Sequence, residues 1–244
     1  EEFSLMSFCD GINIQHMPVV QDHKRAYEND TGPNTGGMGT YSDLGHSLPF
    51  LNSADLDTAK KINEMTMLAL KKETGMDYMG VLYGGFMAVK DGVRLIEYNA
   101  RFGDPEAMNV LSILNSDFIE ICRAITEKRL CDIDILFEAK ATVCKYAVPE
   151  GYPDTPVKGH GVDISQVKDQ DSLYFASVDI KDGKLIESGS RTLAAVSVAD
   201  TIELAEQSCE ETISQINGPL FHRKDIGTQP LITKRIENMK KIRC

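Results

Sequence analysis

The sequence lacks several features that define whole classes of protein. No apolar run approaches the roughly 20 residues that are needed to span a bilayer, and the six cysteines show neither a C-x-x-C pair nor a regular spacing. That pattern argues against a zinc site and a disulfide framework. Positive charge is scarce, because 26 lysines and arginines stand against 37 aspartates and glutamates, for a net charge of −11. Since binding of nucleic acid needs a basic face, we expect neither a membrane nor a nucleic acid as a partner.

What is present is the composition of a globular protein, with 244 residues of which 42% are hydrophobic and 26% charged. No signal-peptide pattern is visible and the cysteines are expected to be reduced, which predicts a cytoplasmic location. Cys122 and Cys209 fall in helical patterns and are interpreted as small buried hydrophobes. Residues 3–8 already form a strand pattern with no turn before it. We therefore expect the chain to start in the middle of a fold.

Hydrophobic periodicity and turn residues predict the order of elements. Asp104, Asp117 and Asp200 are the expected N-caps of three helices. Residues 21–49 are rich in glycine and lack periodicity, which predicts a long functional loop. The pattern of elements changes near Ile135, so we predict two domains, 1–134 and 135–244. The predicted strands cover 3–8, 12–20, 78–89, 93–99, 142–148, 173–180, 185–187 and 192–198, and the helices cover 52–73, 105–114, 117–129, 201–216 and 231–243.

The segment LIEYNARFGDPEAM, residues 95–108, is the most informative in the chain. Side chains alternate across a strand, so Glu97 and Asn99 project from one face. A carboxylate beside an amide oxygen suits Mg²⁺, whose other ligands are commonly water and substrate phosphates. Arg101 continues the same alternation two residues after Asn99. Asp104-Pro105 then begins a helix, whose N-terminus favours negative charge. The apolar strands 78–89 and 93–99 are expected to be buried on both faces.

The alternative for this segment is a solvated strand face followed by an ordinary helix start, because Glu-x-Asn is common on strands. A second polar cluster favours the functional interpretation. It comprises the run QDHKR (21–25) and the glycine-rich run GPNTGGMG (32–39).

Three segments in this order resemble the glycinamide ribonucleotide synthetase (phosphoribosylamine–glycine ligase) family of the ATP-grasp superfamily, and its archaeal-type branch in particular. They are QDHKRAYENDTGPNTGGMGTYS (21–42), GVLYGGFM (80–87) and LIEYNARFGDPEAM (95–108). The similarity continues through KYAVPEGYP (145–153) and RKDIG (223–227), so it covers essentially the whole chain. One of these motifs alone would be weak evidence, whereas several in order are specific.

The resemblance implies an α+β protein: an ATP-grasp core subdomain, made of an antiparallel sheet with helices, and a smaller C-terminal α/β domain. The family's N-terminal and lid domains are expected to be absent before Glu1, and the missing half to be present in cis or as a separate chain. The implied reaction joins glycine to 5-phosphoribosylamine through glycyl phosphate, with ATP as co-substrate and Mg²⁺ or Mn²⁺ as cofactor, in de novo purine synthesis. The 244 residues alone are expected to have negligible activity.

The resemblance also implies roles for individual residues. Glu97 and Asn99 would hold the metal, Lys24, Arg101 and Asp104 would take part in catalysis, and Glu2, Phe86 and Glu97 would contact ATP, with Phe86 near adenine. The backbone of the GGMG run would form an anion nest for the ribose phosphate. The substrate-binding residues would be Asp22, Arg25, Asn34, Thr35, Gly36, Gly37, Gly39, Pro105 and Arg191.

Other interpretations stay open at this point. Lys24 and Arg25 could be a solvated loop pair, and the glycines could simply form tight turns. Arg191 is the weakest assignment, because Gly189-Ser190-Arg191 stands where many family members have Gly-Gly-Arg. For the whole chain, the alternatives are another ATP-grasp carboxylate–amine ligase and a non-catalytic remnant of the fold. The presence of all the phosphate and metal residues argues against a remnant.

Overall fold

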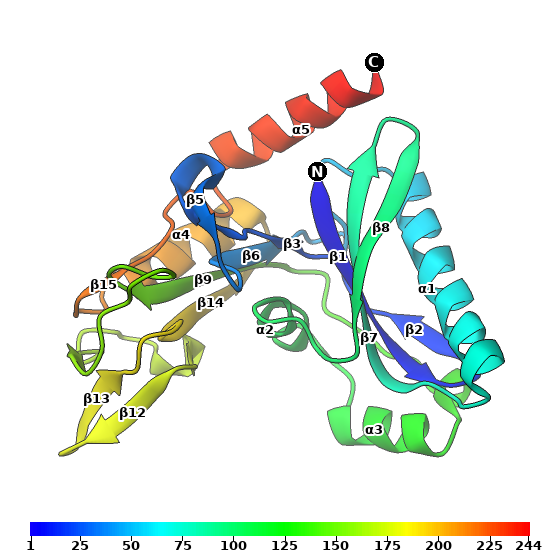
Figure 1. Ribbon diagram of the computed structural model, residues 1–244, viewed down its shortest axis with the longest axis horizontal. Helices are drawn as coiled ribbons and strands as arrows, with labels where there is room; N and C mark the ends of the chain where they lie inside the picture. The colour runs from blue at the N-terminus through cyan, green and yellow to red at the C-terminus, as the bar shows by residue number, and fades with distance from the viewer.

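Antiparallel strand pairing organises the chain. In the computed structural model, which describes residues 1–244, the strand pairs of both large sheets are antiparallel. Two lobes result, each with one of these sheets, and the helix α2 (Glu106–Leu111) lies between them (Figure 1). The predicted α+β class is confirmed.

The first sheet has four strands in the order β2–β1–β7–β8. The hairpin at Asp91-Gly92 joins β7 to β8 as predicted, and the Asp10-Gly11 turn leads from β1 towards β2. The predicted partner strand 12–20 is shorter in the structure, because only three of its residues pair with β1 in a ladder. The bounds are β1 (Glu2–Asp10), β2 (Ile14–His16), β7 (Met79–Val89) and β8 (Gly92–Asn99).

Two helices pack against this sheet. The helix α1 (Ser53–Thr74) begins with a capping box between Asn52 and Asp55 and ends at Gly75, whose φ of 72° suits a residue without a Cβ. The helix α3 (Phe118–Thr126) begins at Asp117, whose side chain accepts from the amides of Ile119 and Glu120. Both helices lie where the periodicity predicts them.

The second sheet joins strands from both halves of the chain, in the order β11–β14–β9–β6–β3, with β15 also paired to β9. The prediction of a loop over 21–49 is therefore wrong in part, because short strands within it pair with each other or with β9. The helix α4 (Ile202–Ile213) packs on β9 and β14. The strands are β3 (Gln21–Asp22), β6 (Gly39–Ser42), β9 (Ala141–Pro149), β11 (Leu173–Phe175), β14 (Leu193–Ala199) and β15 (Leu220–Phe221).

Smaller elements complete the fold. The predicted strand 173–180 divides between two sheets, because β11 joins the large sheet whereas β12 pairs with β13. The C-terminal helix α5 (Gln229–Arg243) lies where it was predicted (Figure 1), and its Ile232 and Met239 belong to the main hydrophobic core. The remaining elements are β4 (Arg25–Tyr27), β5 (Thr31–Asn34), β10 (Gly161–Val162), β12 (Val178–Lys181), β13 (Lys184–Glu187) and the 3₁₀ turns η1 (Glu28–Asp30), η2 (Leu130–Asp132) and η3 (Gln170–Ser172).

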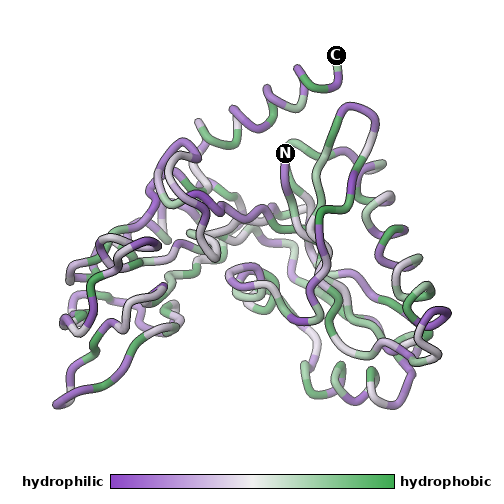
Figure 2. The backbone as a smooth tube through the Cα atoms, in the orientation of Figure 1, coloured by the Kyte–Doolittle hydropathy of each residue, from purple (hydrophilic) through white to green (hydrophobic).

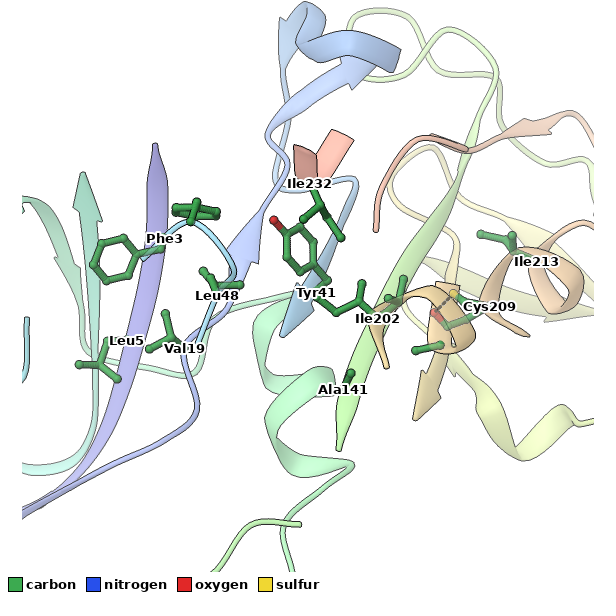
Figure 3. Close-up of a cluster of buried hydrophobic side chains, with 14 of the residues drawn as sticks. Phe3, Leu5, Val19, Tyr41, Leu48, Ala141, Ile202, Cys209, Ile213 and Ile232 are labelled. Atoms are coloured by element: carbon green, nitrogen blue, oxygen red, sulfur yellow. Dashed lines mark hydrogen bonds between the residues drawn. The ribbon is translucent and has the colours of Figure 1, made fainter. Parts of the chain in front are cut away.

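One hydrophobic core crosses from the first sheet to the second. Phe3 and Leu5 of β1, Tyr41 of β6, and Cys209 and Ile213 of α4 belong to the same cluster of buried side chains (Figure 3). The two predicted domains thus share a sheet and a core. The boundary at residues 134 and 135 stays a prediction.

Several local predictions are wrong. Asp104 is not an N-cap, since α2 begins after Pro105 without a side-chain cap, and Asp200 is not one either, because Thr201 accepts the hydrogen bond from the Leu204 amide. Strand β8 is an edge strand with exposed outer residues, such as Ile96 at 49%, so it is not buried on both faces. Cys122 is exposed, whereas Cys209 is buried as predicted.

Hydrophobic and hydrophilic residues alternate along the helices α1 and α5 (Figure 2). This pattern is typical of helices that pack one face against the rest of a protein. Among the helices of the structure, none combines the length and the hydropathy that a membrane span requires.

Candidate active site

A cavity of about 210 Å³ brings together polar residues that lie far apart in the sequence. It is formed where β8 ends, where α2 begins, and where the segment after β3 meets the glycine-rich loop. Its lining has a single hydrophobic residue, so its chemistry is set by charges and hydrogen-bonding groups. The lining residues are Asp22, Lys24, Thr35, Gly36, Tyr83, Glu97, Asn99, Arg101, Gly103, Asp104 and Glu106.

Glu97 and Asn99 lie side by side on β8, as their spacing predicts. The side-chain NH₂ group of Asn99 donates to Glu97 Oε1 at 3.4 Å. The amide oxygen of Asn99 takes no part in this hydrogen bond. Gly85 of β7 pairs with Glu97, and a Cβ there would lie 3.4 Å from Glu97 Cγ. One carboxylate and one amide oxygen, open to the cavity, are a donor set that fits a divalent cation with further ligands from water or phosphate.

Lys24 places a cation among carboxylates in this cavity. Its ammonium lies 2.8 Å from Glu2 Oε1. Burial opposes the charge of Lys24, but the hydrogen bond to Glu2 and the nearby charges of Asp22 and Glu97 outweigh burial and raise the pKa of Lys24. Lys24 is therefore a permanent cation at neutral pH.

Arg101 supplies the second cation of the cavity, and its surroundings differ from those of Lys24. Its side chain is exposed and donates to the carbonyl of Phe102 at 2.7 Å. No carboxylate lies within ion-pair distance of its guanidinium, in contrast to Lys24. Its remaining N–H donors are free to meet an anion in the cavity.

Arg191 clamps two of the cavity's walls together. Its guanidinium donates to the carbonyl oxygens of Gly36 at 2.8 Å and Asp104 at 3.0 Å, and to Asp104 Oδ2 at 2.7 Å. It also stacks 4.6 Å over the ring of Tyr146, whose hydroxyl donates to Asp104 Oδ1 at 2.9 Å. These partners occupy Arg191, so in this structure it positions the loop rather than presenting donors to a phosphate.

Removing this clamp is expected to loosen the glycine-rich loop. In Arg191→Ala, the amides of residues 34–39 should exchange with solvent roughly tenfold faster, because charge-assisted hydrogen bonds to Gly36 and Asp104 are lost. Hydrogen-exchange mass spectrometry measures this. Arg94→Ala is the control, since Arg94 pairs with Asp91 on the exposed surface. Unchanged exchange in Arg191→Ala would show that the loop does not depend on the clamp.

The predicted anion nest in the GGMG run is not formed. The amide of Gly37 donates to Thr35 Oγ1 at 3.0 Å, that of Met38 to the carbonyl of His23, and that of Gly36 to the Tyr152 hydroxyl at 3.4 Å. Gly39 lies outside the cavity, where the Cys144 carbonyl leaves no room for a Cβ. These glycines allow close packing of the chain instead of offering amides to an anion.

Some predicted residues are not brought to this cavity. Phe86 is fully buried and stacks on Phe3, with ring centroids 5.5 Å apart, so it is a core residue in this structure rather than a contact for adenine. Pro105 is buried behind Gly37. Arg25 and Asn34 line a second cavity of about 390 Å³, which also contains Glu2 and shares Asp22 and Lys24 with the first.

Three residues of the site were missed, Tyr83, Gly103 and Glu106. Glu106 is 2% exposed, and its Oε1 accepts a hydrogen bond from the Tyr83 hydroxyl at 2.8 Å. Burial raises the pKa of Glu106, and burial together with the charge of Glu106 holds the pKa of Asp22 well above its usual range. In the sequence, Glu106 looked like an acidic residue of an ordinary helix start, so no local signal distinguished it.

The fold and the cavity define an ATP-grasp protein. The model of the ATP-grasp (A) domain of phosphoribosylglycinamide synthetase matches residues 1–107, and that of the C domain of the same enzyme matches residues 142–229. The chain belongs to the phosphoribosylglycinamide synthetase family.

Individual relatives agree with this assignment. Phosphoribosylamine–glycine ligases of Methanosarcina acetivorans and Methanocaldococcus jannaschii are 52% and 53% identical over 100% and 99% of this chain, and in each case the chain covers 55% of the relative. The crystal structure of the Thermotoga maritima phosphoribosylamine–glycine ligase matches 93% of this chain and 55% of that chain, with a TM-score of 0.82 and 29% identity. The biotin carboxylase domain of Hydrogenobacter thermophilus 2-oxoglutarate carboxylase shares the fold alone, with a TM-score of 0.59 and 13% identity over 98% of this chain and 49% of that one. The chain thus spans about half the length of the curated relatives that it matches.

Proposed function

We propose that this chain forms the phosphoryl-transfer half of a phosphoribosylamine–glycine ligase. The observation that carries the proposal is the cavity in which the Glu97–Asn99 pair, Lys24 and Arg101 converge. A pair of hard oxygen donors facing two cations suits the transfer of a phosphoryl group, which needs positioning and charge neutralisation more than a covalent protein group. Relatives that are 52% and 53% identical to this chain are named phosphoribosylamine–glycine ligases, which supports glycine as the substrate whose carboxylate is phosphorylated.

The proposed reaction has two steps. A carboxylate oxygen of glycine attacks the γ-phosphorus of ATP, the bond to the β-γ bridging oxygen breaks, and ADP leaves glycyl phosphate behind. The amine of 5-phosphoribosylamine then attacks the acyl carbon, phosphate leaves, and the new amide nitrogen loses a proton. In this proposal, Arg101 would offset charge on the acyl phosphate, and Lys24 would neutralise the phosphates of ATP.

Glu97 and Asn99 would hold Mg²⁺ or Mn²⁺ in this reaction. ATP-grasp enzymes in general use ATP with divalent cations, and the donor set of this pair fits such an ion. When bound, the cation supplies charge neutralisation for the ATP phosphates. The proposal covers either of these two ions.

The remaining predicted roles are divided between the two cavities. Asp22, Thr35, Gly36 and Asp104 border the first cavity, where the amine substrates would be oriented. Glu2, Arg25 and Asn34 border the second, where Glu2 would contact ATP and the other two the phosphoribosyl substrate. Arg191 and Gly37 act on substrate binding indirectly, through the shape of the glycine-rich loop. The cytoplasmic location stays a prediction.

The relatives also contain residues that this chain does not match, since it covers 55% of them. We propose that the complete active site uses the counterparts of those residues, in cis or on a separate polypeptide. The activity is therefore tested on the native protein as it is isolated from the cell.

The test of this function is ADP release by the native protein. The assay contains ATP, Mg²⁺, glycine and freshly made phosphoribosylamine, and each component is omitted in turn. We expect glycinamide ribonucleotide to form only when all four are present, and the native mass to be above the 27.0 kDa of these 244 residues. Turnover with a different carboxylate or amine in place of glycine or phosphoribosylamine would show that this protein has another ligase activity. No ADP release under any condition would contradict an enzymatic role.

A further inference from the structure

Asp22 and Glu106 form a pair of buried carboxylates in the wall of the first cavity. They come from different elements, Asp22 from β3 and Glu106 from the first turn of α2. Asp22 Oδ1 accepts from the His23 amide at 2.7 Å, and Glu106 Oε1 accepts from the Tyr83 hydroxyl. No lysine or arginine lies within ion-pair distance of either carboxylate, although both border a cavity that contains cations.

Two glycines leave space in front of these carboxylates. A Cβ on Gly37 would lie 2.8 Å from Asp22 Oδ1, and a Cβ on Gly103 would lie 2.5 Å from Glu106 Oε2. Any other residue at either position would therefore push against the pair. Gly103 lines the cavity, so the absence of a side chain there keeps Glu106 accessible from it.

Charges of both signs line the cavity. Among them, Asp22 and Glu106 have no ion-pair partner, whereas Lys24 is paired with Glu2 and Asp104 with Arg191. Arg101 lines the same cavity and has no carboxylate partner. Burying carboxylates without a cation costs free energy, so a positively charged ligand group would be stabilised beside Asp22 and Glu106. A small molecule with an ammonium at one end and a carboxylate at the other matches this arrangement, and the volume of about 210 Å³ suits a small amino acid.

We propose that Asp22 and Glu106 are the ammonium-binding residues for the amino acid substrate, and that Tyr83 positions Glu106 for this contact. The inference rests on the proposed function and states which residues of the cavity bind the amino group and which bind the carboxylate of the amino acid. Arg101 then faces the carboxylate that is phosphorylated, and the acidic pair faces the amino group of the same molecule.

Holding this group as an ammonium has a chemical consequence. An –NH₃⁺ group has no lone pair, so the amino acid cannot attack a second acyl phosphate, and the amine of the other substrate is the only nucleophile. The acidic pair would in this way both select an α-ammonium carboxylate and prevent its self-condensation.

The test compares glycine with glycolate, which has a hydroxyl group in place of the ammonium. ADP release by the native enzyme and by its Glu106→Gln variant is measured with each acid. Loss of a charge-assisted contact should raise the KM for glycine roughly 10- to 100-fold and reduce the preference for glycine over glycolate by a similar factor. The KM for ATP should stay the same, which separates this role from a general structural one. Glu73→Gln, at an exposed position of α1, is the matched control and should resemble the native enzyme.

Two further variants keep the test decisive if Glu106→Gln does not fold. Tyr83→Phe removes only the hydroxyl group that holds Glu106 and should raise the KM for glycine severalfold, whereas Asp22→Asn should match the loss expected for Glu106→Gln. Folded variants that retain the glycine KM and the preference over glycolate would overturn the inference while leaving the ligase function intact. A native enzyme without glycine-dependent ADP release would instead overturn the function itself.

Discussion

Replacing Glu97 by glutamine is expected to lower ADP formation by the native protein roughly 100-fold or more. The substitution keeps the shape of the side chain but removes the only carboxylate of the Glu97–Asn99 pair. Stabilisation of transition-state charge by a bound cation is worth several kcal/mol, and about 3 kcal/mol corresponds to about two powers of ten in rate. We also expect weaker binding of Mn²⁺ in the presence of ATP, measured by electron paramagnetic resonance.

The matched control for Glu97 lies on the same hairpin. Asp91 is an exposed carboxylate in the turn between β7 and β8 and pairs with Arg94 on the surface. Asp91→Asn should leave both ADP formation and Mn²⁺ binding unchanged. If Glu97→Gln retained normal Mn²⁺ binding, Glu97 would not be a metal ligand, whatever its effect on turnover.

Replacing Lys145 by methionine is expected to destabilise the chain by about 3 kcal/mol. Lys145 of β9 is 0% exposed, and its ammonium lies 2.7 Å from Glu206, 2.7 Å from Glu210 and 2.9 Å from the carbonyl of Lys224. Removing one partner of a buried ion pair costs roughly 3–5 kcal/mol, because the remaining charge stays buried without compensation. The two glutamates are partly exposed, which favours the lower end of that range. Urea unfolding followed by circular dichroism measures the free energy of unfolding.

A surface ion pair provides the control for Lys145. Lys140 pairs with Asp200, and both side chains are well exposed, so Lys140→Met should cost less than about 1 kcal/mol. Equal losses in the two variants would mean that burial of Lys145 adds nothing to its effect.

The pH dependence of stability gives a second measurement on Lys145. Burial opposes ionisation of Glu210, but hydrogen bonds from Lys145 and His222 outweigh it and hold the pKa of Glu210 below its ordinary value of 4.5. A carboxylate whose pKa is lower in the folded state contributes stability above its unfolded pKa and loses it as the pH falls through the folded pKa. The protein should therefore lose stability in acid below about pH 4.5. This acid dependence should be weaker in Lys145→Met.

The sequence predicted the local features of the fold well where one element contains all the information. Apolar periodicity over 52–73 and the stop at Gly75 predicted α1, and the structure adds a capping box at Asn52 that also lies within a few residues. The parity of Glu97 and Asn99 follows from the alternation of any strand. Both results depend on backbone geometry that does not need the rest of the protein.

Predictions failed where the partner of a residue lies elsewhere in the chain. The segment 21–49 has no periodicity of its own, yet β6 forms because β9, about a hundred residues later, supplies its ladder. Phe86 looked suited to an adenine contact, but Phe3 covers it from β1. The burial of Lys145 was not predicted, and the two glutamates of α4 that accompany it lie more than sixty residues later.

The sequence by itself determined the family, most helices and strands, and the oxygen pair on β8, because motifs and periodicity are local patterns. Only the tertiary structure decided which side chains share the cavity. Asp22 and Glu106 are 84 residues apart by their numbers (106 − 22), and Arg191 reaches both Gly36 and Asp104. Burial, the raised pKa of Asp22 and the clamp at Arg191 arise from contacts between distant segments, and no local pattern encodes which segments meet.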